Sequence, residues 1–370
     1  MKEQNVNILF FVIFLVISQF FITRFIISTY YSNDEMKKLT EHLNLVEYSD
    51  DEENEEVRAH RAGRVSGNEE LNLAERNSMP SNKINPSFSN TYSISKKLCP
   101  NKTDSRVKFS QEKIEEIKQN KYKIHPNKMK IDILAELTPL DLDKCLIRLG
   151  QKYDGGYVIL DHLLDKIEVV YSYGVNDDTM FESQFSNLFN SKMRLYDFSI
   201  DKVAYHPNFY FVKEGVGPAT DKFKLLDTVE NHLRKNNDFG KRKILKLDVE
   251  GAEYSTIEQM PESILLEFDQ IIMELHSIYE KFNEFKKIIL KINKHFYLYH
   301  IHSNNYSYMS KHGHNLKLPN VLEICWIKKE LVNPEEVYFS NKNYPTSIDA
   351  PNTPQKDDLD LNFWPFIFNM

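Results

Sequence analysis

Short apolar runs recur between residues 130 and 330 of this 370-residue chain, and amphipathic stretches separate most of them. The runs are rich in β-branched and aromatic residues and lie between turn-forming residues, which is typical of β-strands. We therefore expect seven strands, at residues 167–173, 193–196, 209–212, 244–247, 270–274, 296–300 and 321–326.

Helices are predicted between several of these strands, near residues 179–190, 221–236, 252–266 and 280–294. In the last helix, apolar residues from Phe282 to Ile292 recur at the spacing that buries one helix face. Strands that alternate with helices indicate a doubly wound α/β fold with a mostly parallel sheet. The seventh strand has no helix before it and is most easily accommodated antiparallel, so we expect a seven-stranded sheet with the last strand reversed.

The first thirty residues form a separate apolar segment. From Ile8 to Ile27 the sequence is nearly all Ile, Leu, Val and Phe, and a helix of about 20 residues can cross about 30 Å of hydrocarbon. The segment continues through residues 29–31 without a small-residue cleavage site, which favours an uncleaved signal anchor over a removed signal peptide. The sequence therefore predicts an N-terminal transmembrane helix.

The remaining composition divides the chain into parts. Acidic runs such as Asp50–Glu56, followed by Ser/Asn/Pro-rich sequence, predict a disordered stalk that ends with a short helix near residues 108–122. The aromatic cluster Phe363–Phe368 favours a tail that docks on the globular domain over a second membrane contact. The expected boundaries are an anchor at 1–32, a stalk at 33–129, an α/β domain at 130–330 and a tail at 331–370.

The net charge of −7 comes from one region. Residues 34–76 hold 13 acidic and 6 basic residues, which leaves 41 of each elsewhere. The rest of the chain therefore lacks the basic excess of a nucleic-acid-binding protein, and we expect no nucleic-acid partner.

The cysteines and the glycosylation sequons give information on the cellular compartment of the chain. Cys99, Cys145 and Cys325 have no metal-ligand spacing, so neither a zinc cluster nor a disulfide framework is indicated. A single Cys99–Cys145 bridge remains open if the domain is lumenal. Asn101 and Asn305 begin glycosylation sequons, which tilt the location only slightly. We expect a single-pass protein of the endoplasmic reticulum or Golgi with a lumenal domain, although the charges flanking the anchor leave its orientation open.

The fourth predicted strand leads into three carboxylates, Asp248, Glu250 and Glu253. Ligands of open α/β sheets gather outside the carboxyl ends of the strands, so this segment indicates an enzyme site. Glu274 and His276 share one face at the end of the next strand. Structural alternatives remain: Asp248 as a helix cap, the glutamates as complements to the helix dipole, and His276 as a buried structural histidine.

A second set of residues indicates a nucleoside site. Gly174 ends the first predicted strand and lets a backbone turn approach a ligand closely. Asp197 ends the second strand about twenty residues later, the spacing at which a carboxylate accepts both hydroxyls of a ribose. The glycine spacing of a dinucleotide fingerprint is missing, so adenosine without phosphates is favoured over NAD.

Several motifs between residues 145 and 328 carry a family resemblance: Arg148-Leu-Gly150, Asp154-Gly-Gly-Tyr157, Tyr173-Gly-Val175, Asp197, Leu247-Asp-Val-Glu-Gly-Ala-Glu253, Glu274-Leu-His276 and His302-Ser-Asn-Asn305. Together they resemble the FkbM-type S-adenosylmethionine-dependent methyltransferases, especially the membrane-anchored methyltransferase-like eukaryotic members. The resemblance implies a Rossmann-like methyltransferase fold, S-adenosylmethionine as cofactor, Gly174 in the cofactor turn and Asp197 at the ribose. Asn176 stands where this family often has glycine, so the turn requires Asn176 to adopt a positive φ.

We therefore expect a methyltransferase that transfers a methyl group to a hydroxyl of a small-molecule or glycan acceptor. The expected site residues are Asp248, His276 and Glu274 for catalysis and Gly174, Asn176 and Asp197 for the cofactor. Asp248 or His276 would be the general base, and a divalent ion held by Asp248, Glu274 and His276 is a less favoured alternative.

Two other functions stay open. One is a membrane-anchored glycosyltransferase that uses Asp248 and Glu250 as metal-binding acids. The other is a non-catalytic binding module that keeps the methyltransferase fold, an alternative that depends on Asn176.

Overall fold

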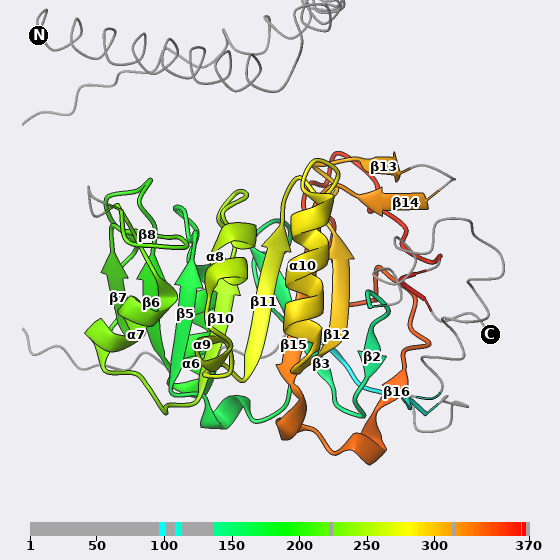
Figure 1. The fold of residues 1–370 in the computed structure, drawn as a ribbon, viewed down its shortest axis with the longest axis horizontal. Helices are drawn as coiled ribbons and strands as arrows, with labels where there is room; N and C mark the ends of the chain where they lie inside the picture. Colours follow the sequence, from blue (N-terminus) through cyan, green and yellow to red (C-terminus); the bar gives the residue numbers. More distant parts are fainter. Residues whose placement is uncertain are drawn as a thin grey trace, which may run out of the picture. The chain divides into compact units, whose positions relative to one another are not determined.

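Seven strands form the central sheet of the computed structural model (Figure 1). In chain order they are β5 (Val169–Tyr173), β6 (Lys192–Tyr196), β7 (Phe209–Val212), β10 (Lys243–Leu247), β11 (Gln270–Leu275), β12 (Phe296–Ser303) and β15 (Leu322–Lys328). Their order across the sheet is β12-β15-β11-β10-β5-β6-β7. β15 is antiparallel to both of its neighbours and the other pairs are parallel, which confirms the predicted seven-stranded sheet with a reversed last strand.

The last strand lies inside the sheet, between β11 and β12. The first six residues of β15 are all buried, and a strand that is buried on both sides needs neighbours and covered faces. The structure describes residues 96–100, 108–110, 112, 136–221, 225–312, 316–363 and 365–367.

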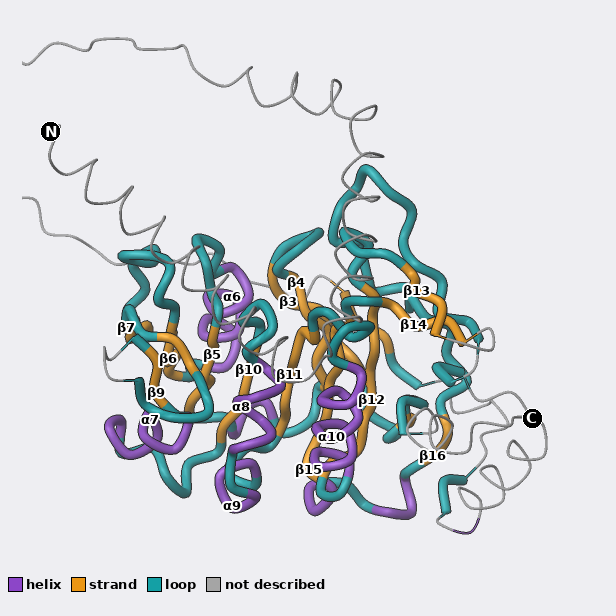
Figure 2. Tube along the Cα trace, turned by 45° about the horizontal axis from the view of Figure 1, so that its top comes forward, coloured by secondary structure: helices purple, strands orange, loops and turns teal. Residues whose placement is uncertain are grey.

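Helices cover both faces of the sheet: α6 (Met180–Phe189), α7 (Val229–Asn236), α8 (Glu253–Gln259), α9 (Glu262–Leu265) and α10 (Phe282–Asn293). α7, α8 and α10 lie in front of the sheet in Figure 1, and they pack Leu233, Ile257 and Ile288 into one core. α6 lies on the opposite side of the sheet (Figure 2). It contributes Phe181 and Phe185 to a second core of buried residues. The doubly wound arrangement is therefore present.

Two predicted helices differ from the expectation. The stretch 252–266 forms two helices because Pro261, which has no N–H to donate, separates α8 from α9. In the described part of the stretch 221–236 the helix begins at Val229, because β8 (Gly215–Val216) and β9 (Leu226–Asp227) pair with each other before it. Thr228 caps α7 by accepting a hydrogen bond from the Asn231 N–H at 3.1 Å.

Shorter strands and turns surround the sheet. They are β1 (Lys96–Leu98), β2 (Leu140–Asp141), β3 (Leu146–Gly150), β4 (Gly156–Leu160), β13 (Met309–His312), β14 (Leu316–Pro319), β16 (Tyr338–Phe339) and the 3₁₀ helices η1 (Leu164–Lys166), η2 (Lys329–Leu331) and η3 (Pro334–Glu336). β1, β3 and β4 form an antiparallel sheet, and a disulfide joins Cys99 to Cys145 beside it. β1 therefore lies within the range predicted as the stalk, 33–129.

The predicted anchor at residues 1–32 and most of the predicted stalk lie outside the described residues. Within the described ranges, no helix is long and apolar enough to cross a membrane. In the C-terminal tail, Leu361 and Phe366 are buried in the same core as Tyr344. The described part of the tail therefore packs on the α/β domain.

Candidate active site

Asp248, Glu274 and His276 come together at the carboxyl ends of the neighbouring strands β10 and β11. Asp248 directly follows β10, Glu274 lies in β11 and His276 follows its last residue. His276 Nε2 is 3.7 Å from Glu274 Oε1 and 3.9 Å from Asp248 Oδ1. The three residues that the sequence predicts as catalytic are therefore neighbours, and we call them the acid–histidine cluster.

The two glutamates that follow Asp248 have different surroundings. Glu253 is fully buried, and its Oε1 accepts hydrogen bonds from His276 Nδ1–H and the Val249 N–H, both at 3.0 Å. Glu250 is 87% exposed at its side chain, and its Oε2 lies 3.5 Å from His276 Nε2. Ala252, not Asp248, occupies the N-cap position of α8. Asp248 therefore belongs to the cluster, and Glu253 fixes the orientation of the His276 ring.

Tyr157 ends the Asp154-Gly-Gly-Tyr157 motif but is not among the site residues predicted from the sequence. Its hydroxyl donates a hydrogen bond to Asp248 Oδ2 at 2.7 Å. The β3–β4 hairpin brings Tyr157 to this position, and Gly155 supplies the positive φ of 77° in its turn. The Asp154-Gly-Gly-Tyr157 motif is thus a tight turn that also delivers a hydroxyl to the cluster. Its signal in the sequence is the tyrosine at the end of the glycine pair.

Other polar residues lie next to the cluster. Asn304 Nδ2 donates a hydrogen bond to Glu274 Oε1 at 2.7 Å. His300 and His302, which share a face of β12, are buried and form hydrogen bonds with Asp349 and Glu323 at 3.0 and 3.3 Å. Both of these histidines are therefore structural.

The surroundings shift the proton affinities of the cluster. Burial raises the pKa of Asp248, although the charge of Lys246 opposes this shift. Burial also raises the pKa of Glu274 well above its usual range, and the charge of Asp248 adds to the effect. Burial lowers the pKa of His276, but the hydrogen bond to Glu253 and the nearby carboxylates outweigh it and raise the pKa to about 9. With its imidazole protonated at neutral pH, His276 is a poor base, and Asp248 is the better proton acceptor.

The predicted cofactor residues form a turn beside this cluster. Gly174 follows β5 with a φ of 75°, and Asn176 has a φ of 48°. Asn176 therefore adopts the positive φ that the turn requires. Its N–H donates a hydrogen bond to Asp197 Oδ2 at 2.9 Å, and Asp197 Oδ1 accepts from the Ser199 N–H at 2.7 Å. Oδ1 also accepts from the Ser199 hydroxyl at 2.6 Å. Because each carboxylate oxygen can accept two hydrogen bonds, Oδ2 keeps one acceptor position for a ribose hydroxyl.

Phe198 is a second residue that sequence reasoning missed. It follows Asp197 directly and is 55% exposed, which is unusual for a phenylalanine. A Cβ added at Gly215 would lie 2.8 Å from the Phe198 ring. The half-exposed ring therefore lies against Gly215 of β8, directly after Asp197 in the chain.

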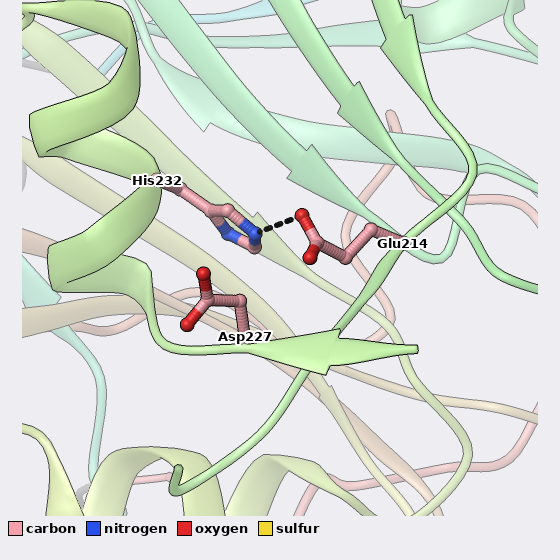
Figure 3. A group of neighbouring side chains, drawn as sticks. All are labelled: Glu214, Asp227 and His232. Carbon is pink, nitrogen blue, oxygen red and sulfur yellow. Dashed lines mark hydrogen bonds and ion pairs between the residues drawn. The ribbon is translucent and has the colours of Figure 1, made fainter. Parts of the chain in front are cut away.

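A second group of two carboxylates and a histidine lies behind the cofactor turn: Glu214, Asp227 and His232 (Figure 3). His232 Nε2 lies 3.1 Å from Glu214 Oε2, and its Nδ1 lies 3.0 Å from the Tyr173 hydroxyl. Burial lowers the pKa of His232, so a neutral ring donates to Glu214 and accepts from Tyr173. This buried cluster supports the strand that leads into Gly174.

The sheet, the glycine turn with Asp197 and the acid–histidine cluster together define a methyltransferase-type α/β domain. Residues 160–308 match the family model of the Methyltransferase FkbM domain, a range that includes all six predicted site residues. This match confirms the resemblance seen in the motifs.

No curated protein matches the chain. Among solved structures, it resembles the crystal structure of precorrin-6Y C5,15-methyltransferase from Geobacter metallireducens GS-15, with a TM-score of 0.25 and 10% identity over 44% of this chain and 81% of that chain.

Proposed function

We propose that the protein is an S-adenosylmethionine-dependent O-methyltransferase. The observation that carries this proposal is the contact between the two halves of the site. The Asp248 N–H donates a hydrogen bond to the Tyr173 carbonyl at 3.1 Å, immediately before Gly174. A cofactor on the turn at Gly174 and a hydroxyl at Asp248 would therefore lie next to each other, as direct transfer requires.

The proposed reaction needs one proton acceptor. The acceptor oxygen forms a bond to the methyl carbon, and the C–S bond breaks with its electron pair left on sulfur, which gives S-adenosylhomocysteine. The hydroxyl proton passes to the Asp248 carboxylate, whose other oxygen is held by Tyr157. His276, held by Glu253, stays beside the reacting oxygen.

The surroundings favour an acceptor with several hydroxyls, such as a glycan or a polar small molecule. Carboxylates of the cluster accept hydrogen bonds from hydroxyl groups. Tyr279 follows the carboxyl end of β11, and Tyr306 and Tyr308 follow that of β12. Each of the three tyrosines is about half exposed. The Tyr306 N–H donates to Asn304 Oδ1, which connects this tyrosine to the Glu274 partner. Aromatic rings with one polar end suit a ligand that is partly apolar and partly wet.

Calorimetric titration separates this function from its rivals. The full-length chain should bind S-adenosylhomocysteine and should not bind a uridine diphosphate sugar. The opposite result would favour the glycosyltransferase alternative. Binding of S-adenosylhomocysteine without methyl transfer to any hydroxyl acceptor would favour the non-catalytic binding module.

The Asp197→Ala variant should bind S-adenosylhomocysteine about 1–3 kcal/mol more weakly, because the ribose hydroxyls would lose a charged acceptor in a partly dry site. The Asp201→Asn variant is the control, since the Asp201 carboxylate is 86% exposed and pairs only with Lys213 among the described residues. Calorimetry on both variants measures the effect. Equal affinity for Asp197→Ala and the parent would show that Asp197 only links Asn176 to Ser199.

The proposed location is a membrane of the endoplasmic reticulum or Golgi, with the domain in the lumen. The Cys99–Cys145 disulfide supports this location because disulfides persist in oxidising compartments. Asn305 is buried, and its amide donates to the Thr353 and Lys356 carbonyls. Its glycosylation sequon therefore does not support the proposed lumenal location. The full-length chain should resist alkaline carbonate extraction, and non-reducing peptide mapping should recover Cys99 linked to Cys145. Release of the chain or two free thiols would contradict the proposal.

A further inference from the structure

We infer that the acid–histidine cluster binds a divalent cation between Asp248, Glu274 and His276. The inference deepens the proposed function, since the ion would act on the acceptor hydroxyl at the same site. One ligand-capable atom from each of the three residues lies within 4.8 Å of the other two. Glu274 lies in β11, and Asp248 and His276 directly follow the adjacent parallel strands β10 and β11, which set the positions of the three backbones.

The His276 ring presents one nitrogen to the cluster. Nδ1 is taken by Glu253, whereas Nε2 faces Glu250, Glu274 and Asp248 at 3.5, 3.7 and 3.9 Å. These separations are too long for hydrogen bonds, and Nε2 makes none to any residue that the structure describes. A histidine that donates one ring N–H to a carboxylate and turns the other nitrogen toward oxygen ligands is typical of metal sites.

The carboxylate ligands are supported from outside the cluster in the same way. Tyr157 donates to the second oxygen of Asp248, and Asn304 donates to Glu274. Such outer hydrogen bonds hold ligating carboxylates in metal centres. All three candidate ligands thus have a fixed orientation toward one another.

The carboxylates around His276 also favour a cation at this site. Four carboxylates surround the one imidazole within 3.9 Å of its ring nitrogens. One oxygen of the buried Glu253 has no hydrogen-bond partner among the described residues. Lys246 is the nearby ammonium, but its Nζ lies 3.7 Å from Glu182 and 4.6 Å from the centre of the Tyr157 ring. A divalent ion at this place would be surrounded by these carboxylate oxygens and would take Nε2 as its nitrogen ligand.

The cluster behind the cofactor turn has the same residue types and serves as a contrast (Figure 3). There, Lys235 Nζ already lies 2.8 Å from Asp227 and 3.2 Å from Glu214. Both ring nitrogens of His232 have partners. An ion at that cluster would have to displace an ammonium group, whereas no ammonium of the described chain lies between Asp248, Glu274 and His276.

The ligand chemistry selects the class of ion. Two carboxylates and one imidazole, with the remaining positions free for water or an acceptor oxygen, suit a hard divalent cation such as Mg²⁺ or Mn²⁺. An acceptor hydroxyl on such an ion would have a lowered pKa and would release its proton to the general base more readily. The ion thereby assists the O–H bond cleavage that methyl transfer requires.

Titration of the chelator-treated full-length chain with Mn²⁺, by calorimetry and electron paramagnetic resonance, tests the inference. The parent should bind one Mn²⁺ ion. Glu253→Gln should weaken Mn²⁺ binding by about 10- to 100-fold, and His276→Gln should weaken it by at least as much. The matched control is His295→Gln, which removes a histidine that lies 3.0 Å from the half-exposed Glu262 and should leave Mn²⁺ binding unchanged.

Binding of S-adenosylhomocysteine, measured on the same samples, shows that each variant is folded and separates the two proposals. If the parent binds S-adenosylhomocysteine but no Mn²⁺, the metal site is wrong and the proposed function stands. If it binds Mn²⁺ but not S-adenosylhomocysteine, the metal site stands and the proposed function fails. Parental Mn²⁺ affinity in His276→Gln, or a loss only in Glu214→Gln, would also overturn the metal site.

Discussion

Asp248→Asn should lose methyl transfer by about a hundredfold or more, the scale of a missing general base, while it still binds S-adenosylhomocysteine. The asparagine side chain keeps the size of aspartate and an oxygen that can accept the Tyr157 hydrogen bond, but it removes the negative charge. Stability should therefore fall by only about 1 kcal/mol. Transfer of tritiated methyl from S-adenosylmethionine to glycan and small-molecule fractions measures the effect.

The control for this variant is Asp201→Asn, which makes the same chemical change at an exposed aspartate. It should transfer methyl groups at the parental rate. Because Asp248 is not a helix cap in the structure, a small loss of stability cannot account for a large loss of activity. If Asp248→Asn transfers methyl groups as fast as the parent, the catalytic role moves to Glu274 or His276.

Most of the sheet was predictable because its strands are short apolar runs of the right length. All seven predicted strands are present, and each overlaps its observed range. The position of β15 between β11 and β12 was not predictable, since periodicity gives the burial of a strand and not its neighbours. The break at Pro261 was readable in principle, because proline cannot continue the hydrogen bonds of a helix interior.

The candidate site was predictable where residues follow strand ends. Asp248, Glu274 and His276 meet because β10 and β11 are neighbours and parallel. Tyr157 could not be found in this way, since it reaches Asp248 from a separate hairpin 91 residues earlier in the chain. The role of Glu253 also required the structure, because a glutamate in the first turn of a helix is ordinarily explained by the helix dipole.

Gly174→Ala should abolish binding of S-adenosylhomocysteine and destabilise the domain by about 4 kcal/mol or more, a loss that single substitutions rarely reach. A Cβ added at Gly174 would lie 1.6 Å from the Asp248 carbonyl oxygen and 2.7 Å from its carbonyl carbon. Both atoms are backbone, so the turn and the acid–histidine cluster would have to move apart. The glycine thus maintains the close contact between the two halves of the site.

Gly240→Ala separates this contact from the cost of the backbone conformation. Gly240 has a φ of 72°, nearly that of Gly174, but an added Cβ there would meet nothing within 4 Å. The free energy of unfolding of Gly240→Ala should fall by only roughly 1–2 kcal/mol, the cost of placing an alanine in the left-handed conformation. Chemical denaturation of both full-length variants, with titration of S-adenosylhomocysteine, gives the comparison. Equal losses in the two variants would mean that Gly174 is needed only for its φ, and that the close approach of the turn to Asp248 does not hold the site together.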